Sequence, residues 1–155
     1  MTLEKITDFI TVESIDLNLK STNKTEVLLE LTKLLEKSSK LENFDKTLEA
    51  LKEREKLGST GIGKGVAIPH AKTEFAKDLT IAFGISKQGI NFNAVDDEKV
   101  NIFFVFASPI KNSQTYLKIL ARISRLIRND EFREKLLNAK SSVEVIELID
   151  YEEKN

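Results

Sequence analysis

The chain has 155 residues, 41% of them hydrophobic, which suits one domain around a single core and is a poor fit to two. Its 24 basic and 25 acidic residues give a net charge of -1, which argues against nucleic acid and anionic membranes as partners. The absence of cysteine and the single histidine exclude disulfides, thiolate nucleophiles, cysteine-ligated zinc and His-paired metal sites. No apolar stretch approaches the roughly 20 residues that span a bilayer, so we expect a soluble, cytoplasmic and unprocessed protein.

Two helices are predicted in the first third of the chain. Asn23 stands three residues before Glu26 and just ahead of apolar residues at helical spacing, which predicts a helix over about 24–38. The same spacing begins again at Phe44 and predicts a second helix that ends near residue 56, before Gly58.

The middle of the chain predicts β-strands. Residues 79–86, 90–93 and 100–107 are rich in β-branched and aromatic side chains, and Lys87-Gln88-Gly89 predicts a turn between the first two. The last strand contains the run NIFFVFA, which is apolar on both alternating faces. This pattern indicates a central strand that is covered on both sides.

The last third of the chain returns to helical patterns. A long amphipathic helix is marked by apolar residues from Tyr116 to Ile127, and a short helix around Phe132 follows it. Ser141 and Glu144 form a capping-box pattern that opens a final helix.

This order of elements predicts one α/β domain over residues 1–155, with an ordered core over about 1–150 and a frayed tail at 151–155. Helices first, strands in the middle and helices last favour a mixed sheet of four to five strands, flanked by helices on both faces.

His70 is the only histidine and the only side chain expected to titrate near neutral pH. Most single histidines are surface or core residues satisfied by a backbone carbonyl, so the residue type alone does not indicate catalysis. Its setting favours a reactive role, because Pro69 fixes its own φ and pushes Ile68 toward extended geometry. The imidazole is thus presented from a stiff stem, as a nucleophile requires.

A glycine-rich segment, LGSTGIGKGVAIPH, precedes and includes this histidine and predicts a loop. Its glycines can turn backbone N–H groups toward an anion, and its hydroxyls add further donors. The candidate phosphate-binding residues are Gly58, Ser59, Thr60, Gly61 and Gly63. Arg54 is a candidate clamp for phosphate oxygens, although a solvated helix face is the default interpretation of an arginine in the sequence EREK.

Other chemistries fit less well. Gly58, Gly63 and Lys64 have the spacing of a nucleotide-binding P-loop, but Gly65 stands where a Ser or Thr must bind Mg²⁺. No G-x-S-x-G elbow of a serine hydrolase is present. Residues 96–98, Asp-Asp-Glu, favour a solvated turn over a metal site. We therefore expect no metal and no cofactor.

The segment EREKLGSTGIGKGVAIPHAKT closely resembles the active-site segment of the fructose/mannitol-type EIIA domains of the bacterial phosphotransferase system (PTS), and the resemblance extends over nearly the whole chain. It implies that His70 accepts a phosphoryl group on Nε2 from the phosphohistidine of the carrier protein HPr and passes it to a cysteine of an EIIB domain. It also implies that Arg54 is the family's active-site arginine. Because this chain lacks cysteine, its EIIB partner is expected on a separate polypeptide.

One position departs from the family pattern. Many members carry a second histidine, in a His-Leu pair, at the start of the helix after the apolar strand, where this chain has Tyr116-Leu117. Tyr116 is therefore a possible residue of the site rim. The resemblance implies a phosphocarrier for sugar transport, with the fructose type as the closest match. Two alternatives stay open: a regulator of the nitrogen-related branch, phosphorylated at the same histidine but acting by binding other proteins, and a non-phosphorylated binding module.

Overall fold

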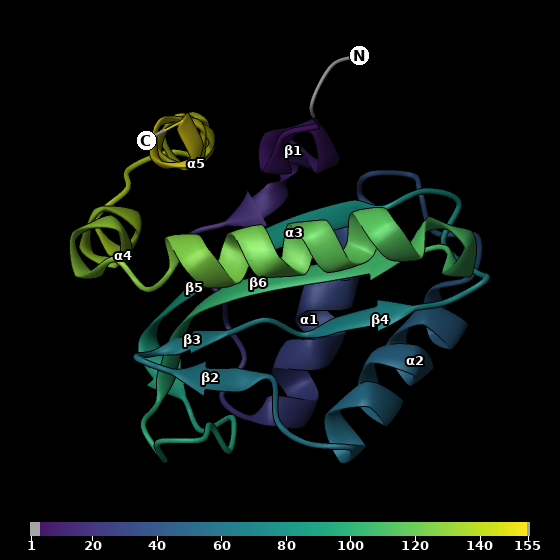
Figure 1. Cartoon of the computed structure of the whole chain (residues 1–155). Helices are drawn as coiled ribbons and strands as arrows, with labels where there is room; N and C mark the ends of the chain where they lie inside the picture. The colour runs from purple at the N-terminus through teal and green to yellow at the C-terminus, as the bar shows by residue number, and fades with distance from the viewer. Residues whose placement is uncertain (1–3, 155) are drawn as a thin grey trace.

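The computed structural model describes residues 4–154 as one mixed β-sheet with helices on both faces (Figure 1). Its strands are β1 (Ile10–Asp16), β2 (Gly61–Gly63), β3 (Val66–Ala67), β4 (His70–Lys72), β5 (Thr80–Ile90) and β6 (Val100–Ser108). Its helices are α1 (Lys24–Glu36), α2 (Phe44–Lys56), α3 (Ser113–Leu126), α4 (Asp130–Leu137) and α5 (Ser142–Lys154), with short 3-10 helices η1 (Ile6–Phe9) and η2 (Ile110–Asn112). The predicted α/β class and helix-covered sheet are confirmed.

Strand β6 is the centre of the sheet. The strand order is β1-β5-β6-β3-β2, and β4 also pairs with β6. Strand β5 lies antiparallel along one edge of β6, while β3 and β4 lie parallel to successive parts of its other edge. The central position predicted for NIFFVFA is therefore confirmed.

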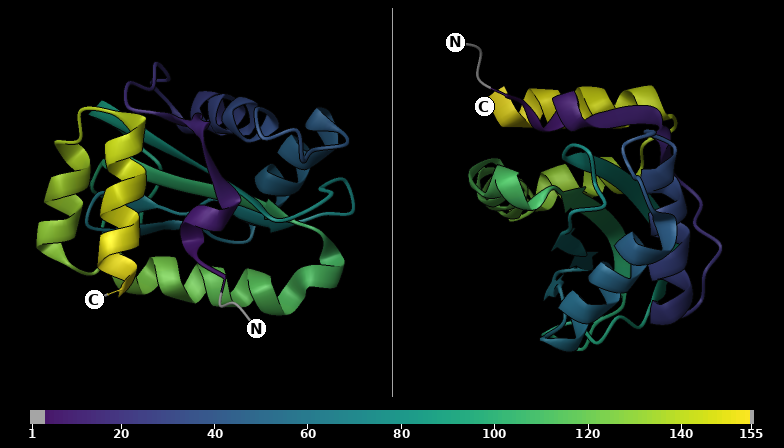
Figure 2. Two further views of the ribbon diagram at one scale, coloured as in Figure 1. Left: turned by 90° about the horizontal axis from the view of Figure 1, so that it is seen from above. Right: turned by 90° about the vertical axis from the view of Figure 1, so that its right-hand side faces the viewer.

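The two faces of β6 belong to two separate hydrophobic cores. Phe104 and Phe106 pack in the core beneath α3, α4 and α5, whereas Phe103 and Val105 pack in the core beneath α1 and α2. The right-hand view in Figure 2 shows these helices on opposite sides of the sheet. Successive strand residues point to opposite faces, so a strand covered on both sides must be apolar throughout.

The glycine-rich segment differs from the predicted loop, because it contributes β2, β3 and the first residue of β4 to the sheet. Strands β2 and β3 pair antiparallel, and Lys64 and Gly65 turn between them with φ of 58° and 79°. A Cβ on Gly61 would lie 2.9 Å from the Cα of Ala94, so this position requires glycine for close backbone approach. With β2, β3 and β4 included, the described residues form six strands, more than the four or five predicted.

The turn predicted at residues 87–89 is wrong. Strand β5 continues through it to Ile90, and the pairing with β6 shifts register between Ile85 and Ile90. Gly89, at φ 83°, donates its N–H to the Ser86 hydroxyl at 3.1 Å. The glycine thus marks an irregularity inside one long strand, as glycine in a strand interior often does.

The two predicted caps are confirmed. The Asn23 side chain accepts the Glu26 N–H at 2.9 Å at the start of α1. At the start of α5, the Ser141 hydroxyl accepts the Glu144 N–H at 3.1 Å, and the Glu144 carboxylate accepts the Lys140 N–H at 2.8 Å.

Helix α5 is longer than predicted. It runs to Lys154, so it includes four of the five residues expected to form a frayed tail, and Asn155 lies outside the described residues. Glu153 in its last turn accepts the N–H of Ile6 at 3.0 Å, which joins α5 to η1. Across residues 4–154, no helix has the length and apolar character needed to cross a membrane.

Candidate functional site

His70 begins β4, immediately after the Ile68-Pro69 break that separates β3 from β4. It pairs with Phe106 of β6, whose N–H donates to the Pro69 carbonyl at 3.0 Å. The imidazole stacks on the Phe106 ring, with centroids 5.5 Å apart and an interplanar angle of 18°. His70 is only 7% exposed, so the predicted stiff mount is a strand in the sheet and not an exposed loop.

The hydrogen bond of the imidazole fixes which nitrogen can react. Nδ1 lies 2.5 Å from the carbonyl oxygen of Ile68. A carbonyl oxygen only accepts hydrogen bonds, so Nδ1 must carry the proton. The neutral ring is therefore the Nδ1–H tautomer, and its lone pair is on Nε2.

The surroundings favour the neutral ring. Burial is the largest influence and lowers the pKa of His70, and the positive charge of Arg54 lowers this pKa further. The hydrogen bond to Ile68 and the negative charge of Glu55 act in the opposite direction, without reversing the shift. A lowered pKa leaves the imidazole neutral at pH 7 and able to attack as a nucleophile.

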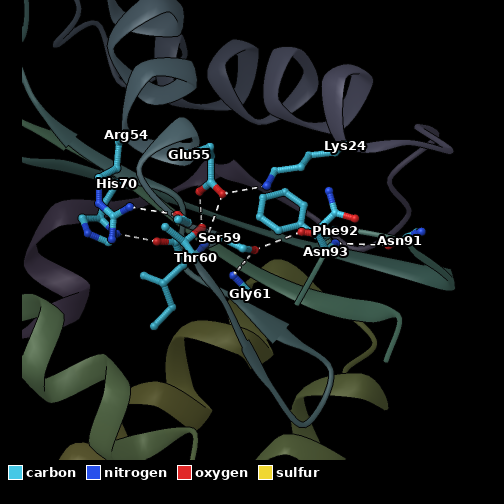
Figure 3. A network of polar contacts seen from close by, with 12 residues as sticks. Lys24, Arg54, Glu55, Ser59, Thr60, Gly61, His70, Asn91, Phe92 and Asn93 are labelled. Atoms are coloured by element: carbon cyan, nitrogen blue, oxygen red, sulfur yellow. Dashed lines mark hydrogen bonds and ion pairs between the residues drawn. The ribbon is translucent and has the colours of Figure 1, made fainter. Parts of the chain in front are cut away.

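Arg54 lies in the last turn of α2 and is half-buried. Its Nη1 donates to the carbonyl of Gly58 at 2.9 Å, and Figure 3 shows its side chain next to that of His70. Within EREK, the ion pair is formed by Lys56 and Glu53, at 2.9 Å, and not by Arg54. The geometry thus favours a role at the histidine over the solvated-face interpretation, with guanidinium donors beyond Nη1 available for phosphoryl oxygens.

The candidate loop residues hydrogen-bond within the protein. Thr60 donates its N–H to Glu55 Oε1 at 3.1 Å and its hydroxyl to Glu55 Oε2. The Ser59 hydroxyl donates to the Phe92 carbonyl at 3.0 Å and accepts the Gly61 N–H at 3.0 Å. These donors would have to leave their partners to bind an anion, so phosphate binding by this loop stays a prediction.

Gly58 and Gly63 occupy different surroundings. Gly58 is exposed and offers its carbonyl to Arg54. A Cβ on Gly63 would lie 3.2 Å from a carboxylate oxygen of Asp96, which also accepts the Lys64 N–H at 3.0 Å. A carboxylate beside Gly63 is unfavourable for a bound anion, so Gly63 serves the hairpin better than a phosphate.

Tyr116 lies in the first turn of α3 and packs directly against the candidate nucleophile. Its ring centroid is 5.7 Å from that of His70 and 5.4 Å from that of Phe106, and the residue is 7% exposed. Burial raises the pKa of Tyr116, and the charge of Arg54 opposes the shift. Lys72 Nζ lies 5.5 Å from the Tyr116 ring centroid. The predicted rim residue thus packs against the imidazole ring of His70.

Glu55 and Lys24 were missed by the sequence reasoning. Glu55 is 8% exposed, and its Oε1 lies 3.0 Å from Nζ of Lys24, which also sits 4.5 Å from the Phe92 ring centroid (Figure 3). In the sequence, Glu55 is one of several charges at the end of α2, and no local pattern relates it to Lys24, 31 residues earlier. Only its place two residues before the glycine-rich segment could have drawn attention to it.

Residues 96–98 lie in an exposed turn, as predicted. Throughout the part of the chain that the structure describes, no group of three or more histidine, aspartate or glutamate side chains is placed to hold a metal ion.

Comparison with known proteins identifies the family. The family model described as "Phosphoenolpyruvate-dependent sugar phosphotransferase system, EIIA 2" matches residues 8–152. The chain belongs to this family. The EIIA domain is 38% identical over 150 residues to the PTS system fructose-specific EIIABC component of Bacillus subtilis (strain 168), covering 97% of this chain but only 24% of that relative. The chain thus spans about a quarter of this relative's length.

Relatives of a second kind match as well. A nitrogen regulatory protein of Bradyrhizobium diazoefficiens is 36% identical over 133 residues, covering 84% of this EIIA domain and 85% of that protein. The crystal structure of the nitrogen regulatory protein IIA-Ntr from Neisseria meningitidis has a TM-score of 0.87 at 31% identity, covering 93% of this chain and 98% of that one. The Escherichia coli enzyme IIAMtl, solved in complex with phosphorylated enzyme IIBMtl, shares the fold at a TM-score of 0.79 and 21% identity, covering 91% and 96% of the two chains.

Proposed function

We propose that this EIIA domain is a phosphocarrier of a sugar phosphotransferase system, in which His70 accepts a phosphoryl group from phospho-HPr and passes it to a cysteine of a separate EIIB. The observation that carries the proposal is the Nδ1 bond of His70 to the Ile68 carbonyl, which leaves the Nε2 lone pair as the nucleophile of a neutral ring. The family match supports a phosphotransfer component.

The proposed reaction has two balanced steps. In the first, the Nε2 lone pair of His70 attacks phosphorus, and the N–P bond of phospho-HPr breaks with its electron pair returning to the donor imidazole. In the second, a thiolate of EIIB attacks the same phosphorus, and Nε2 of His70 leaves with its electron pair. The Ile68 carbonyl stabilises the partial positive charge on Nδ1–H in both steps.

Phosphoryl transfer of this kind needs alignment and charge stabilisation more than covalent assistance. The Phe106 ring and the Ile68 carbonyl align the His70 imidazole. Arg54 is the cation beside it and would stabilise the charge on the phosphoryl oxygens. The chemistry asks for no metal or cofactor.

We propose the fructose-type transport role first, because the Bacillus subtilis relative is a fructose-specific component in which A, B and C parts occur together. The complex of IIAMtl with phosphorylated IIBMtl supports an EIIB as acceptor. The alternative is a regulator of the nitrogen-related branch, favoured by the TM-score of 0.87 to IIA-Ntr. Transfer from the phosphorylated domain to a fructose-type EIIB separates them, because a purely regulatory protein would retain its phosphoryl group.

The test of the proposal is incubation with phosphoenolpyruvate, enzyme I and HPr, followed by intact mass measurement. We expect one added phosphoryl group, lost in acid but stable in base, as a phosphoramidate is. A mass that stays unchanged while HPr is phosphorylated would overturn the phosphocarrier role and leave a binding module.

Tyr116 offers a test through pH. Tyrosine stays neutral at pH 7, especially with the raised pKa of Tyr116, whereas Tyr116→His would place a second titrating imidazole against His70. In the parent, the transfer rate should rise with pH as His70 loses its proton. Because the pKa of His70 is lowered from 6.5, the midpoint of this rise should lie at a pH below 6.5. We expect Tyr116→His to accept the phosphoryl group but to change this profile between about pH 5.5 and 7.5.

The control for this experiment is Tyr116→Phe, which keeps the ring packing and removes only the hydroxyl. It should reproduce the parent profile. Superimposed profiles for the parent and Tyr116→His would show that position 116 is not electrostatically coupled to the reacting imidazole.

A further inference from the structure

A continuous chain of contacts leads from α1 to the reacting histidine. Lys24 pairs with Glu55, and both donors of Thr60, its N–H and its hydroxyl, point to the two oxygens of the Glu55 carboxylate. The Thr60 carbonyl accepts the N–H of Ile68 at 3.0 Å. The carbonyl of the same Ile68 accepts Nδ1–H of His70 at 2.5 Å. Figure 3 shows the Glu55 carboxylate next to Lys24 and Thr60, with His70 on the side away from Lys24.

Thr60 and Ile68 occupy key points in this chain. Ile68 precedes the proline and lies outside both β3 and β4, so its two hydrogen bonds decide where its carbonyl points. Thr60 lies outside α2 and β2, and its orientation depends on the Glu55 carboxylate. Thr60 and Ile68 are thus held by one backbone bond between them and by side-chain contacts to Glu55 and His70.

A buried carboxylate near a phosphoryl site needs an explanation, because negative charge repels the group being transferred and burial is costly for an unpaired ion. The structure removes both objections. Lys24 neutralises Glu55 at 3.0 Å, and three donor groups satisfy its two oxygens. The paired carboxylate thus contributes oriented acceptors while Lys24 offsets its charge, and the positive charge of Arg54 acts beside His70.

We propose that Glu55 is a positioning residue for His70: by anchoring Thr60 it holds Ile68 in place, and Ile68 keeps the imidazole in its Nδ1–H tautomer with Nε2 free to react. The wrong tautomer would place a hydrogen on Nε2, where the lone pair must attack phosphorus. The inference rests on the proposed function for its effect on transfer rate, but the tautomer can be measured without any transfer.

The experiment uses the fact that His70 is the only histidine, so a two-bond ¹H–¹⁵N correlation spectrum of the ¹⁵N-labelled chain reports one imidazole. Above its pKa, the parent should show a protonated Nδ1 and an unprotonated Nε2. Glu55→Met keeps the length of the side chain but removes both acceptors, and it should give a mixture containing the Nε2–H tautomer. We expect phosphoryl acceptance to slow roughly tenfold in this variant, the lower end of the range for losing a group that orients a metal-binding histidine.

Two further variants sharpen the test. In Glu55→Gln, the amide oxygen can still accept the Thr60 N–H, and the amide N–H can donate to the Thr60 hydroxyl, which then acts as an acceptor. This variant should therefore keep the parent tautomer. Thr60→Val removes only one bond of the anchor, so it decides the question if Glu55→Met fails to fold. The matched control is Thr47→Val in α2. It removes a buried hydroxyl that donates to the Asn43 carbonyl at 2.9 Å and makes no hydrogen bond to Glu55, Thr60 or Ile68.

A folded Glu55→Met or Thr60→Val protein with the parent tautomer would overturn the inference and give the role to Pro69 alone. An equal tautomer shift in Thr47→Val would also overturn it, because general loosening would then explain the effect. A third outcome separates the two proposals. If the parent shows the Nδ1–H tautomer and Glu55→Met loses it, but the parent is never phosphorylated, the positioning role of Glu55 is supported and the phosphocarrier role of His70 is refuted.

Discussion

His70→Ala is expected to abolish phosphoryl acceptance completely. The chain has no other histidine and no cysteine, and the structure gives His70 the orientation of a nucleophile through its Nδ1 bond to Ile68. Incubation with phosphoenolpyruvate, enzyme I and HPr should leave the mass of the variant unchanged while the parent gains one phosphoryl group. Acid-labile label that persists in the variant would remove His70 from the mechanism.

Stability must be measured beside this result, because His70 is buried and stacks on Phe106. Removing the ring should cost about 1–3 kcal/mol of unfolding free energy through lost packing. His70→Gln fills more of the space and can still donate to the Ile68 carbonyl, so it should be more stable than His70→Ala and equally unreactive. Equal loss of transfer in two variants of different stability separates the chemical role from the structural one.

Arg54→Lys is expected to slow phosphoryl transfer by roughly tenfold to thousandfold, as for the loss of a preorganised donor. The guanidinium can keep its bond to the Gly58 carbonyl while other N–H groups reach the phosphoryl oxygens. A lysine ammonium retains the charge but lacks this planar fork. The measurement is the rate of phosphoryl acceptance at saturating and at low concentrations of phospho-HPr. Loss of transition-state stabilisation lowers the rate at saturation as well as the rate at low concentration.

A matched control for this substitution is Arg133→Lys. Arg133 also donates to a backbone carbonyl, that of Ile127 at 2.6 Å, but it lies in α4, at the opposite end of the sheet from β4 (Figure 1). The control should transfer at the parent rate. Equal rates for Arg54→Lys and the parent would return Arg54 to a solvated helix face.

Local pattern in the sequence determined much of the secondary structure. The caps at Asn23 and Ser141 have their partners three residues away, so they could be predicted without any knowledge of the fold. The run NIFFVFA predicted a doubly covered strand, because burial on both faces leaves no place for polar residues. The restricted backbone before His70 could also be predicted locally, because it follows from the φ restriction at Pro69.

The errors in the fold arose where glycine had two possible meanings. A glycine such as Gly89 is compatible both with a turn and with an irregularity inside a strand. The pairing of β5 with β6 favours the strand. In the segment around Gly61, the backbone forms strands because β3 and β4 complete the free edge of β6. Edge pairing is a property of the assembled sheet and leaves no local signature in the sequence.

The α/β class, the two covered faces of the central strand, and the candidates His70 and Arg54 could be predicted from the residues alone. The packed fold was needed to show which nitrogen of His70 carries the proton, that Tyr116 packs against its ring, and that Lys24, Glu55 and Thr60 form one connected network. The physical reason is the range of the contacts. Periodicity and capping act within a few residues, whereas Lys24 meets Glu55 across 31 positions and Tyr116 meets His70 across 46, through side chains that only the packed sheet brings together.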